Sequence, residues 1–189
     1  MVQPTDEALM ERFCNGEDVA FDVLFERHAP AVQGFLTRMV RDAALAEDLL
    51  QSTMLSVVRA RGRFEHGMRF QPWLMTIAAN AARDALRKRK LDPQLTDGGE
   101  THAGALALEG GSVPAVMGDP GLRRRLEAAF MALPESQREA VLLHKVQGFG
   151  FGDVAQALGI TETAARIRAH RGYERLRTLL GDLDDRGAA

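Results

Sequence analysis

Hydrophobic residues recur every three or four positions along most of the chain, which is the period of an α-helix with one buried face. One stripe in the N-terminal half runs over residues 20–39: Ala20, Phe21, Leu24, Phe25, Val32, Phe35, Leu36 and Met39. A second follows Asp42, a residue type that caps helices, and comprises Leu45, Leu49, Leu50, Met54, Val57 and Val58. A third starts near Pro72 and comprises Phe70, Trp73, Leu74, Ile77 and Ala81. The pattern predicts consecutive amphipathic helices.

The C-terminal half shows the same period in shorter segments. Helices are predicted over residues 122–131, 135–146, 151–158 and 161–180. Gly159 follows the third of these, where a residue must tolerate positive φ, and Thr161 is placed to cap the fourth. Residues 151–180 therefore have the pattern of a helix, a tight turn and a second helix.

The helical period is lost between Leu91 and Gly121, where glycines and prolines accumulate. This composition predicts that residues 91–120 form a flexible linker. The linker would join a domain at 15–90 to a domain at 121–182. Only 6% of residues are aromatic while Ala, Leu and Arg recur, which favours helices over strands. The predicted fold class is all-α, with two small helical domains joined by the linker.

The residue arrangements that enzymes use are scarce in this chain. Cys14 is the single cysteine and cannot form an internal disulfide, and the five histidines lack metal-ligand spacing. No glycine-rich phosphate loop follows a strand. The pattern disfavours an enzyme and predicts neither a cofactor nor a metal site.

The N-terminus carries Asp6, Glu7 and Glu11 where a signal peptide would be basic, and no apolar run approaches the length of a membrane span. A cytoplasmic protein with no membrane contact of its own is therefore expected.

Charge is unevenly distributed, although the net charge is only −2. One basic patch covers residues 83–90 and a second covers residues 166–177, one in each predicted domain. The compensating acids collect elsewhere, for example at Glu47 and Asp48 and in the tail at Asp182, Asp184 and Asp185. This separation indicates a nucleic-acid partner that overall composition does not suggest.

Residues 151–168 are a helix-turn-helix candidate. In such a motif the second helix lies in the major groove, where arginines reach phosphates or grip guanine through two hydrogen bonds. The alternative is a plain helical hairpin with a solvated basic face. The spacing of Ala155, Gly159 and Thr161 coincides with the charge and favours the motif, which by itself fits many kinds of regulator.

The basic run 87–90 lies at a predicted helix end, where cations are favourable whatever the function. The same helix starts beside a loop that combines Phe64, His66, Met68, Arg69 and Phe70, a mixture that suits unstacked bases. Trp73 has the spacing of a core residue rather than of a stacking platform. The polar group Glu47, Asp48 and Gln51 fits a solvated helix face as well as a partner-binding face.

At the level of whole segments the chain resembles a sigma factor of bacterial RNA polymerase. Residues 46–64 look like the second conserved region of that family, and residues 70–90 resemble its melting and minus-ten recognition helix. Residues 133–143, followed by the helix-turn-helix, are similar to the fourth region. Because no folded third region intervenes, the resemblance is to the extracytoplasmic-function group.

The resemblance implies roles for matching residues. Those implied to bind the polymerase's clamp helices are Glu47, Asp48 and Gln51. Those implied to open or capture the minus-ten strand are Phe64, His66, Arg69, Asn80, Arg83, Asp84 and Arg87. Those implied to read the minus-thirty-five element are Thr163, Arg166, Arg168, His170 and Arg171.

The chain departs from the family pattern in the recognition helix. Thr163-Ala164-Ala165 stands where Gly-Thr-Val is usual, Ile167 replaces a small polar residue, and Ala169 and Gly172 lie on the inner side. Gly within a helix costs about 1 kcal/mol relative to Ala. Either a neighbouring helix approaches unusually closely at Gly172, or the helix is weakly held until DNA binds.

The expected function is therefore a promoter specificity factor that binds core RNA polymerase and promoter DNA and that an anti-sigma factor inhibits. The rival is a stand-alone helix-turn-helix regulator of duplex operator DNA. That rival leaves the N-terminal resemblance unexplained.

Overall fold

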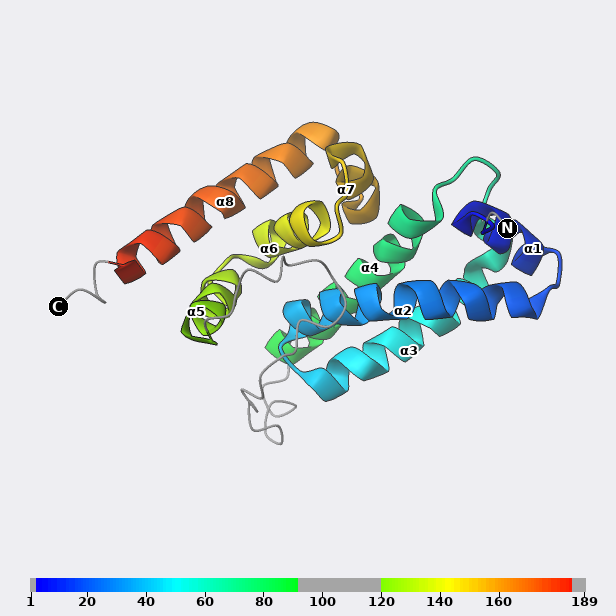
Figure 1. Ribbon diagram of the computed structural model, residues 1–189, viewed down its shortest axis with the longest axis horizontal. Coiled ribbons are helices and arrows are strands. Elements are labelled where there is room, and N and C mark those ends of the chain that lie inside the picture. Colours follow the sequence, from blue (N-terminus) through cyan, green and yellow to red (C-terminus); the bar gives the residue numbers. More distant parts are fainter. Residues whose placement is uncertain (1–2, 92–119, 185–189) are drawn as a thin grey trace. The chain divides into compact units, whose positions relative to one another are not determined.

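The computed structural model describes residues 3–91 and 120–184. The chain divides into two compact units, one made of the described residues up to 91 and the other of those from 120 onward. Over these residues the structure contains helices, turns and loops but no strand, which confirms the predicted all-α class (Figure 1). Nearly all of the predicted linker, residues 91–120, lies outside the described residues.

The first unit consists of α1 (Asp6–Cys14), α2 (Asp18–Val40), α3 (Ala43–Ala60), the short 3-10 turn η1 (Arg61–Arg63) and α4 (Phe70–Leu91). Helices α2, α3 and α4 pack against one another, and α1 packs against α2 and α4 (Figure 1). Most residues of the predicted stripes supply the core, whose largest fully buried side chains include Leu24, Phe35, Leu36, Met39 and Leu74. Met75, which no stripe included, is buried as well, whereas Phe25 of the first stripe is 42% exposed.

Helix α1 precedes the predicted domain start at residue 15, in a segment where the sequence pattern predicts no helix. Its Leu9, Met10 and Phe13 are buried in the first unit. Thr5 caps the helix because its Oγ1 accepts a hydrogen bond from Ala8 N at 3.2 Å. The first unit therefore extends to the beginning of the described chain.

Hydrogen bonds and an ion pair fix the C-terminal end of α4 to the junction of α2 and α3. Asp42 caps α3 as predicted, its Oδ1 accepting from Leu45 N at 3.0 Å. Its Oδ2 accepts from Arg89 at 3.2 Å, and Arg89 also donates to Val40 O at 3.2 Å. Arg89 is thus an anchor within the fold, although it belongs to the basic run.

The second unit consists of α5 (Pro120–Met131), α6 (Glu135–Val141), the π-helical segment η3 (Leu142–Val146), α7 (Phe151–Leu158) and α8 (Glu162–Asp184). Helix α8 packs against α5, α6 and α7. The helix predicted over 135–146 therefore ends in a wider turn, where Gln147 N donates to Leu142 O at 3.1 Å.

The turn between α7 and α8 has the predicted geometry. Gly159 adopts a left-handed conformation with φ of 63°, and Ile160 N donates to Ala155 O at 3.0 Å. Thr161 Oγ1 accepts from Ala164 N at 3.2 Å and so caps α8. Val154, Ala155 and Leu158 are buried, as a helix-turn-helix requires.

Gly172 marks a close approach of α8 to α6. A Cβ atom at this position would lie 2.6 Å from Val141 Cγ2 and 3.4 Å from Gln137 O. Ala169 and Ala165, one and two turns earlier on the same side, are fully buried. Of the two explanations that the sequence left open for Gly172, the structure supports close helix packing.

Candidate nucleic-acid interfaces

The outer face of α4 carries Asn80, Asp84 and Arg87, which are exposed and recur at helical spacing. Arg83, beside them, is half-buried. Its Nη2 donates to Asn80 Oδ1 at 2.7 Å and its Nε donates to Ala79 O at 3.2 Å, while Arg87 pairs with Asp84 at 2.9 Å. These contacts restrict the rotamers of the predicted minus-ten residues.

Small residues on the buried side of α4 let the helix pack closely against its neighbours, with its polar face turned outward. Ala78, Ala79 and Ala82 are fully buried on the opposite side of the helix. Ten residues separate Asn80 from the start of the helix at Phe70, which corresponds to about 15 Å along the axis. The polar face and the preceding loop therefore form two parts of an extended surface.

Aromatic rings at the start of α4 pack on one another. The ring centroid of Phe64 lies 5.3 Å from that of Trp73 and 6.3 Å from that of Phe70, both in edge-to-face arrangements. Phe70 is only 2% exposed and also contacts His28, whereas Phe64 and Trp73 are half-buried. Phe64, at the edge of this cluster, is more exposed than Phe70.

Two polar residues of the same loop, His66 and Arg69, lie outside the aromatic cluster. His66 has a side chain that is 93% exposed, and Arg69 is also exposed. A turn at Gly67, with φ of 89°, separates them. The predicted residues of this loop thus divide into a packed aromatic group and an exposed polar group.

Helix α8 presents Thr163, Arg166, His170 and Arg171 on one exposed face. Ile167 lies among them and is 46% exposed, so an apolar side chain occupies the middle of the predicted reading face. Apolar side chains can contact the thymine methyl group in the major groove. Arg168 is half-buried on the flank, so the structure groups it less closely with the other predicted residues.

The contacts of this face come from within the helix-turn-helix. Arg166 pairs with Glu162 at 3.0 Å, and its guanidinium carbon lies 5.0 Å from the ring centroid of Phe151. His170 Nδ1 lies 3.5 Å from Glu174 Oε2. Exposed pairs of this kind contribute little to stability, so a phosphate or base can replace them at low cost.

Behind the reading face, α8 is held by an apolar cluster of Ala129, Leu133, Val141 and Leu176. Tyr173 packs against this cluster, and burial raises the pKa of its phenol to about 12. The inner side of α8 therefore packs against apolar side chains, and its opposite side carries the charged residues.

The third predicted face lies on α3. Glu47, Asp48 and Gln51 are all exposed, and Leu55, one turn beyond Gln51, is 55% exposed. Leu55 was missed because it belongs to no predicted stripe and the sequence pattern gave it no role. Its position four residues after Gln51 was the available signal.

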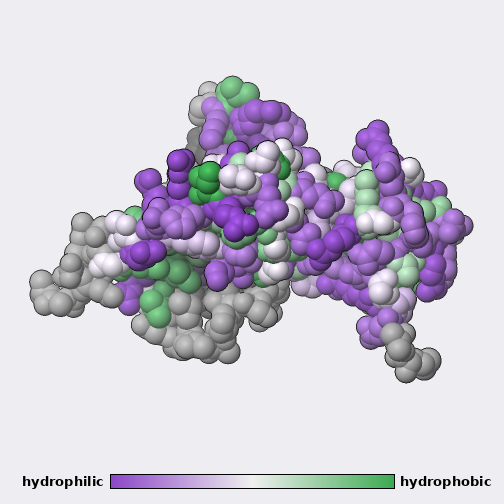
Figure 2. All heavy atoms as spheres, turned by 90° about the horizontal axis from the view of Figure 1, so that it is seen from above, coloured by the Kyte–Doolittle hydropathy of each residue, from purple (hydrophilic) through white to green (hydrophobic). Residues whose placement is uncertain are grey.

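The molecular face drawn in Figure 2 is mostly hydrophilic, and hydrophobic residues reach it in small patches. Among the described residues, no group of three or more His, Cys, Asp and Glu side chains could hold a metal ion. No helix in residues 3–91 or 120–184 is long and apolar enough to cross a membrane.

Comparison with known families matches the two units separately. Residues 24–91 match the family Sigma-70 region 2, and residues 123–176 match Sigma-70, region 4. The first match contains α3, the loop and α4. The second contains the helix-turn-helix.

Two relatives match nearly the whole chain. The RNA polymerase sigma factor CarQ of Myxococcus xanthus is 55% identical over 175 residues, covering 93% of this chain and 97% of that protein. The ECF RNA polymerase sigma factor SigM of Mycobacterium tuberculosis is 32% identical, covering 95% and 87%.

Two solved structures have similar folds. CnrH, in complex with the cytosolic domain of CnrY, has a TM-score of 0.71 at 22% identity and covers 94% of this chain and 97% of its own. The sigma factor RpoE of Bartonella quintana, in complex with the anti-sigma factor NepR, has a TM-score of 0.68 at 29% identity and covers 85% and 96%. Together with the matched regions and relatives, this likeness shows that the chain belongs to the extracytoplasmic-function sigma factors of RNA polymerase.

Proposed function

We propose that this sigma factor uses three separate faces: α3 to bind core RNA polymerase, the 61–70 loop with α4 to open and hold the minus-ten strand, and α8 to read the minus-thirty-five duplex. The assignment gives the region 2 role to residues 15–90 and the region 4 role to residues 121–182. The observation that supports it is that most of the predicted residues of each role are exposed on α3, on the loop with α4, or on α8, while Phe64, Arg83 and Arg168 are half-buried beside them.

For strand opening, the principal residue is Asn80. Arg83 holds the amide oxygen of Asn80 and thereby orients the amide nitrogen as a donor for a base edge. A flipped base gains enough to offset unstacking only when its edge is hydrogen-bonded and its face is stacked. Phe64 and the exposed His66 and Arg69 supply the neighbouring aromatic and cationic groups.

For duplex reading, α8 supplies Arg166, His170 and Arg171 around Ile167, with Thr163 at the helix start and Arg168 on the flank. Arginine contacts to phosphates position the helix, and contacts to base edges give sequence preference. Ile167 is the side chain best placed to favour thymine over cytosine.

For polymerase binding, α3 supplies Glu47, Asp48 and Gln51, with Leu55 as an apolar contact on the same face. A stand-alone helix-turn-helix regulator would have no use for this face. The match of residues 24–91 to sigma region 2 also argues against that rival.

The remaining assignments follow from the family. The factor acts in the cytoplasm and performs no covalent chemistry of its own. The Bartonella relative is held by an anti-sigma factor, and an inhibitor of this kind is proposed here too. Such an inhibitor would mask the basic faces of α4 and α8.

The test is promoter binding by the free chain and by the chain assembled with core RNA polymerase. The proposal expects sequence-specific binding after assembly, with strand opening that Asn80→Ala and Asn80→Asp both reduce. Asn80→Asp keeps an oxygen for Arg83 but loses the amide donor, so it separates base capture from local packing. Equally tight specific binding by the free chain to duplex DNA, without opening, would instead indicate an ordinary regulator.

A further inference from the structure

One stripe of α1 contacts the 61–70 loop along its whole length. Glu7, Glu11 and Cys14 are four and three residues apart and therefore share a helix face. Glu7 Oε1 accepts from Phe70 N at 3.1 Å, at the end of the loop. Glu11 Oε1 lies 2.7 Å from His66 Nδ1, in the middle. Cys14 Sγ donates to Arg61 O at 3.1 Å, at the start.

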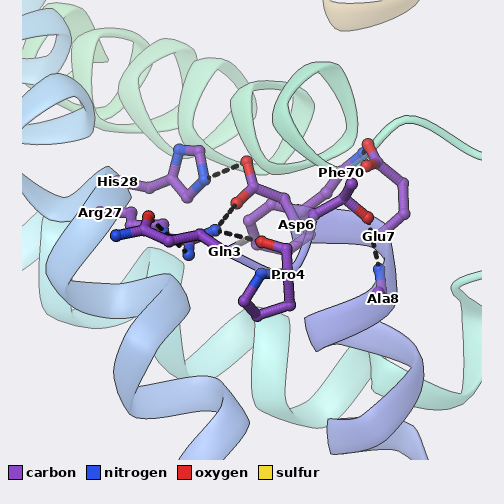
Figure 3. Close-up of polar contacts among 9 residues, drawn as sticks. Gln3, Pro4, Asp6, Glu7, Ala8, Arg27, His28 and Phe70 are labelled. Carbon is purple, nitrogen blue, oxygen red and sulfur yellow. Dashed lines mark hydrogen bonds and ion pairs between the residues drawn. The ribbon is translucent and has the colours of Figure 1, made fainter. Parts of the chain in front are cut away.

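The other faces of α1 fix it firmly to α2. Asp6 accepts from His28 Nε2 at 2.8 Å and from Arg27 Nη1 at 2.9 Å. Phe13 is 2% exposed and stacks on Phe21, with ring centroids 4.9 Å apart. In Figure 3 Asp6 points toward Arg27 and His28, while Glu7 next to it points toward Phe70. Adjacent carboxylates thus join α1 to the core and to the loop.

The contact from Glu7 also bears on α4. The first N–H groups of a helix have no partner within it, and a carboxylate there is favoured by the helix dipole. Glu7 accepts one of these N–H groups, at Phe70, the first residue of α4. Glu7 is therefore a cap that α1 supplies to the helix carrying Asn80.

We propose that α1 is a positioning element for promoter opening. Glu7 and Glu11 hold the 61–70 loop in the conformation that receives the opened strand, and they do so without contacting DNA. The inference rests on the proposed function, because the loop and Asn80 must engage the minus-ten strand for its position to matter.

The chain contains its own reporter for the loop. Trp73 is the only tryptophan in the sequence, and its ring lies 5.3 Å from that of Phe64. Displacement of the loop would uncover the indole, which shifts its emission to longer wavelength and increases quenching by acrylamide. This measurement needs neither polymerase nor DNA.

The decisive variant is Glu7→Ala with Glu11→Ala, and two variants serve as controls. Glu7→Gln loses the charge but keeps an oxygen that can accept from Phe70 N. Glu17→Ala removes a carboxylate that pairs with Arg12. In the free protein we expect a red-shifted and more quenchable Trp73 for the double variant, and wild-type spectra for both controls.

In the polymerase complex, we expect the double variant to slow formation of the open promoter about tenfold, the effect of losing about one hydrogen bond to a charged group. Binding of the double variant to core polymerase should be unchanged. The separate control Glu7→Gln should open the promoter at close to the wild-type rate. This pattern excludes a merely structural role, in which polymerase binding and opening fall together.

Two results would overturn the inference, and they differ from failure of the proposed function. If the Trp73 spectrum of the double variant matches the wild type, α1 does not position the loop. If the spectrum changes but opening does not, while Asn80→Ala still slows opening, the loop position is irrelevant to opening. If Asn80→Ala also leaves opening unchanged, the proposed function itself is wrong.

Discussion

Helices α4 and α8 are alike in outline, but polar side chains from outside the helix anchor both ends of α4. They span 22 and 23 residues, and each has a buried side rich in small residues opposite a polar, largely basic face. On α4, Arg83 holds Asn80, Arg89 ties the helix end to Asp42, and Glu7 of α1 caps its start. On α8, the outer contacts come from the neighbouring Glu162, Glu174 and Phe151.

The difference suits the two kinds of DNA that the proposed sites would bind. An opened strand is flexible, so its site must fix several groups in advance if a base is to be captured without a large loss of entropy. A duplex is already ordered, so a rigid helix with exchangeable surface pairs can adjust to it.

The largest effect is expected from Arg166→Ala combined with Arg171→Ala. Two lost contacts to phosphates or guanine should weaken promoter binding by the assembled polymerase about a hundredfold, since such contacts contribute about 1–3 kcal/mol each. Fluorescence anisotropy with a labelled promoter measures this loss. Arg124→Ala, which removes an exposed arginine of α5, is the control. A loss of equal size in that control would mean that the effect is only general charge.

Gly172→Val tests whether α8 depends on its close approach to α6. The added methyl groups have no room beside Val141, and overpacking of this kind costs about 1–3 kcal/mol. Faster hydrogen exchange of α6 and α8 amides, with α2 amides unchanged, would show the loss. Gly181→Ala has nothing within 4 Å of the new Cβ and should slightly stabilise the same helix.

Arg89→Ala separates structure from DNA binding within the basic run of α4. Its side chain is partly exposed, so losing the bonds to Asp42 and Val40 should lower the free energy of unfolding of the first unit by about 1 kcal/mol. Urea denaturation followed by Trp73 fluorescence measures it. Lys88→Ala, at an exposed neighbour, should change stability much less. Equal effects would argue that Arg89 is ordinary surface.

The smallest effect concerns Tyr173, the chain's only tyrosine. Because burial raises its pKa to about 12 in the fold, above the value of about 10 in the unfolded chain, unfolding releases its proton more easily. Its contribution to stability is thus complete below pH 10 and declines as pH rises from 10 to 12. Absorbance at alkaline pH should show titration near 12, and a midpoint near 10 in folded protein would contradict the burial of α8's inner side.

Much of this architecture could be predicted from local pattern. Asp42, Gly159 and Thr161 act where cap chemistry places them, and the periodic stripes became the core of each unit. The contacts of α1 could not be predicted, because Glu7 and Phe70 are 63 residues apart and no local rule pairs them. Gly172 was recognised as unusual, but the choice between a close approach and a weak helix needed the position of Val141.

For the candidate sites, pattern identified the helix faces better than the individual contacts. Phe25, which the first predicted stripe places on the buried face, is 42% exposed, and Leu55, which no stripe included, is 55% exposed. Phe70 was placed both in the third stripe and in the loop, and its packing against His28 decides for burial. Such exceptions depend on tertiary packing and cannot be read from spacing.

The most direct test of the two-site account is run-off transcription with core polymerase, using promoters in which each element is altered separately. Scrambling the minus-thirty-five element should abolish the deficit of Arg166→Ala with Arg171→Ala and leave that of Asn80→Ala. On a promoter whose minus-ten element is already open, the deficit of Asn80→Ala should disappear and that of Arg166→Ala with Arg171→Ala should remain. Each deficit is coupled to its own element. If both variants respond alike to both promoters, or if the chain yields no new start site, the account of α4 and α8 is wrong.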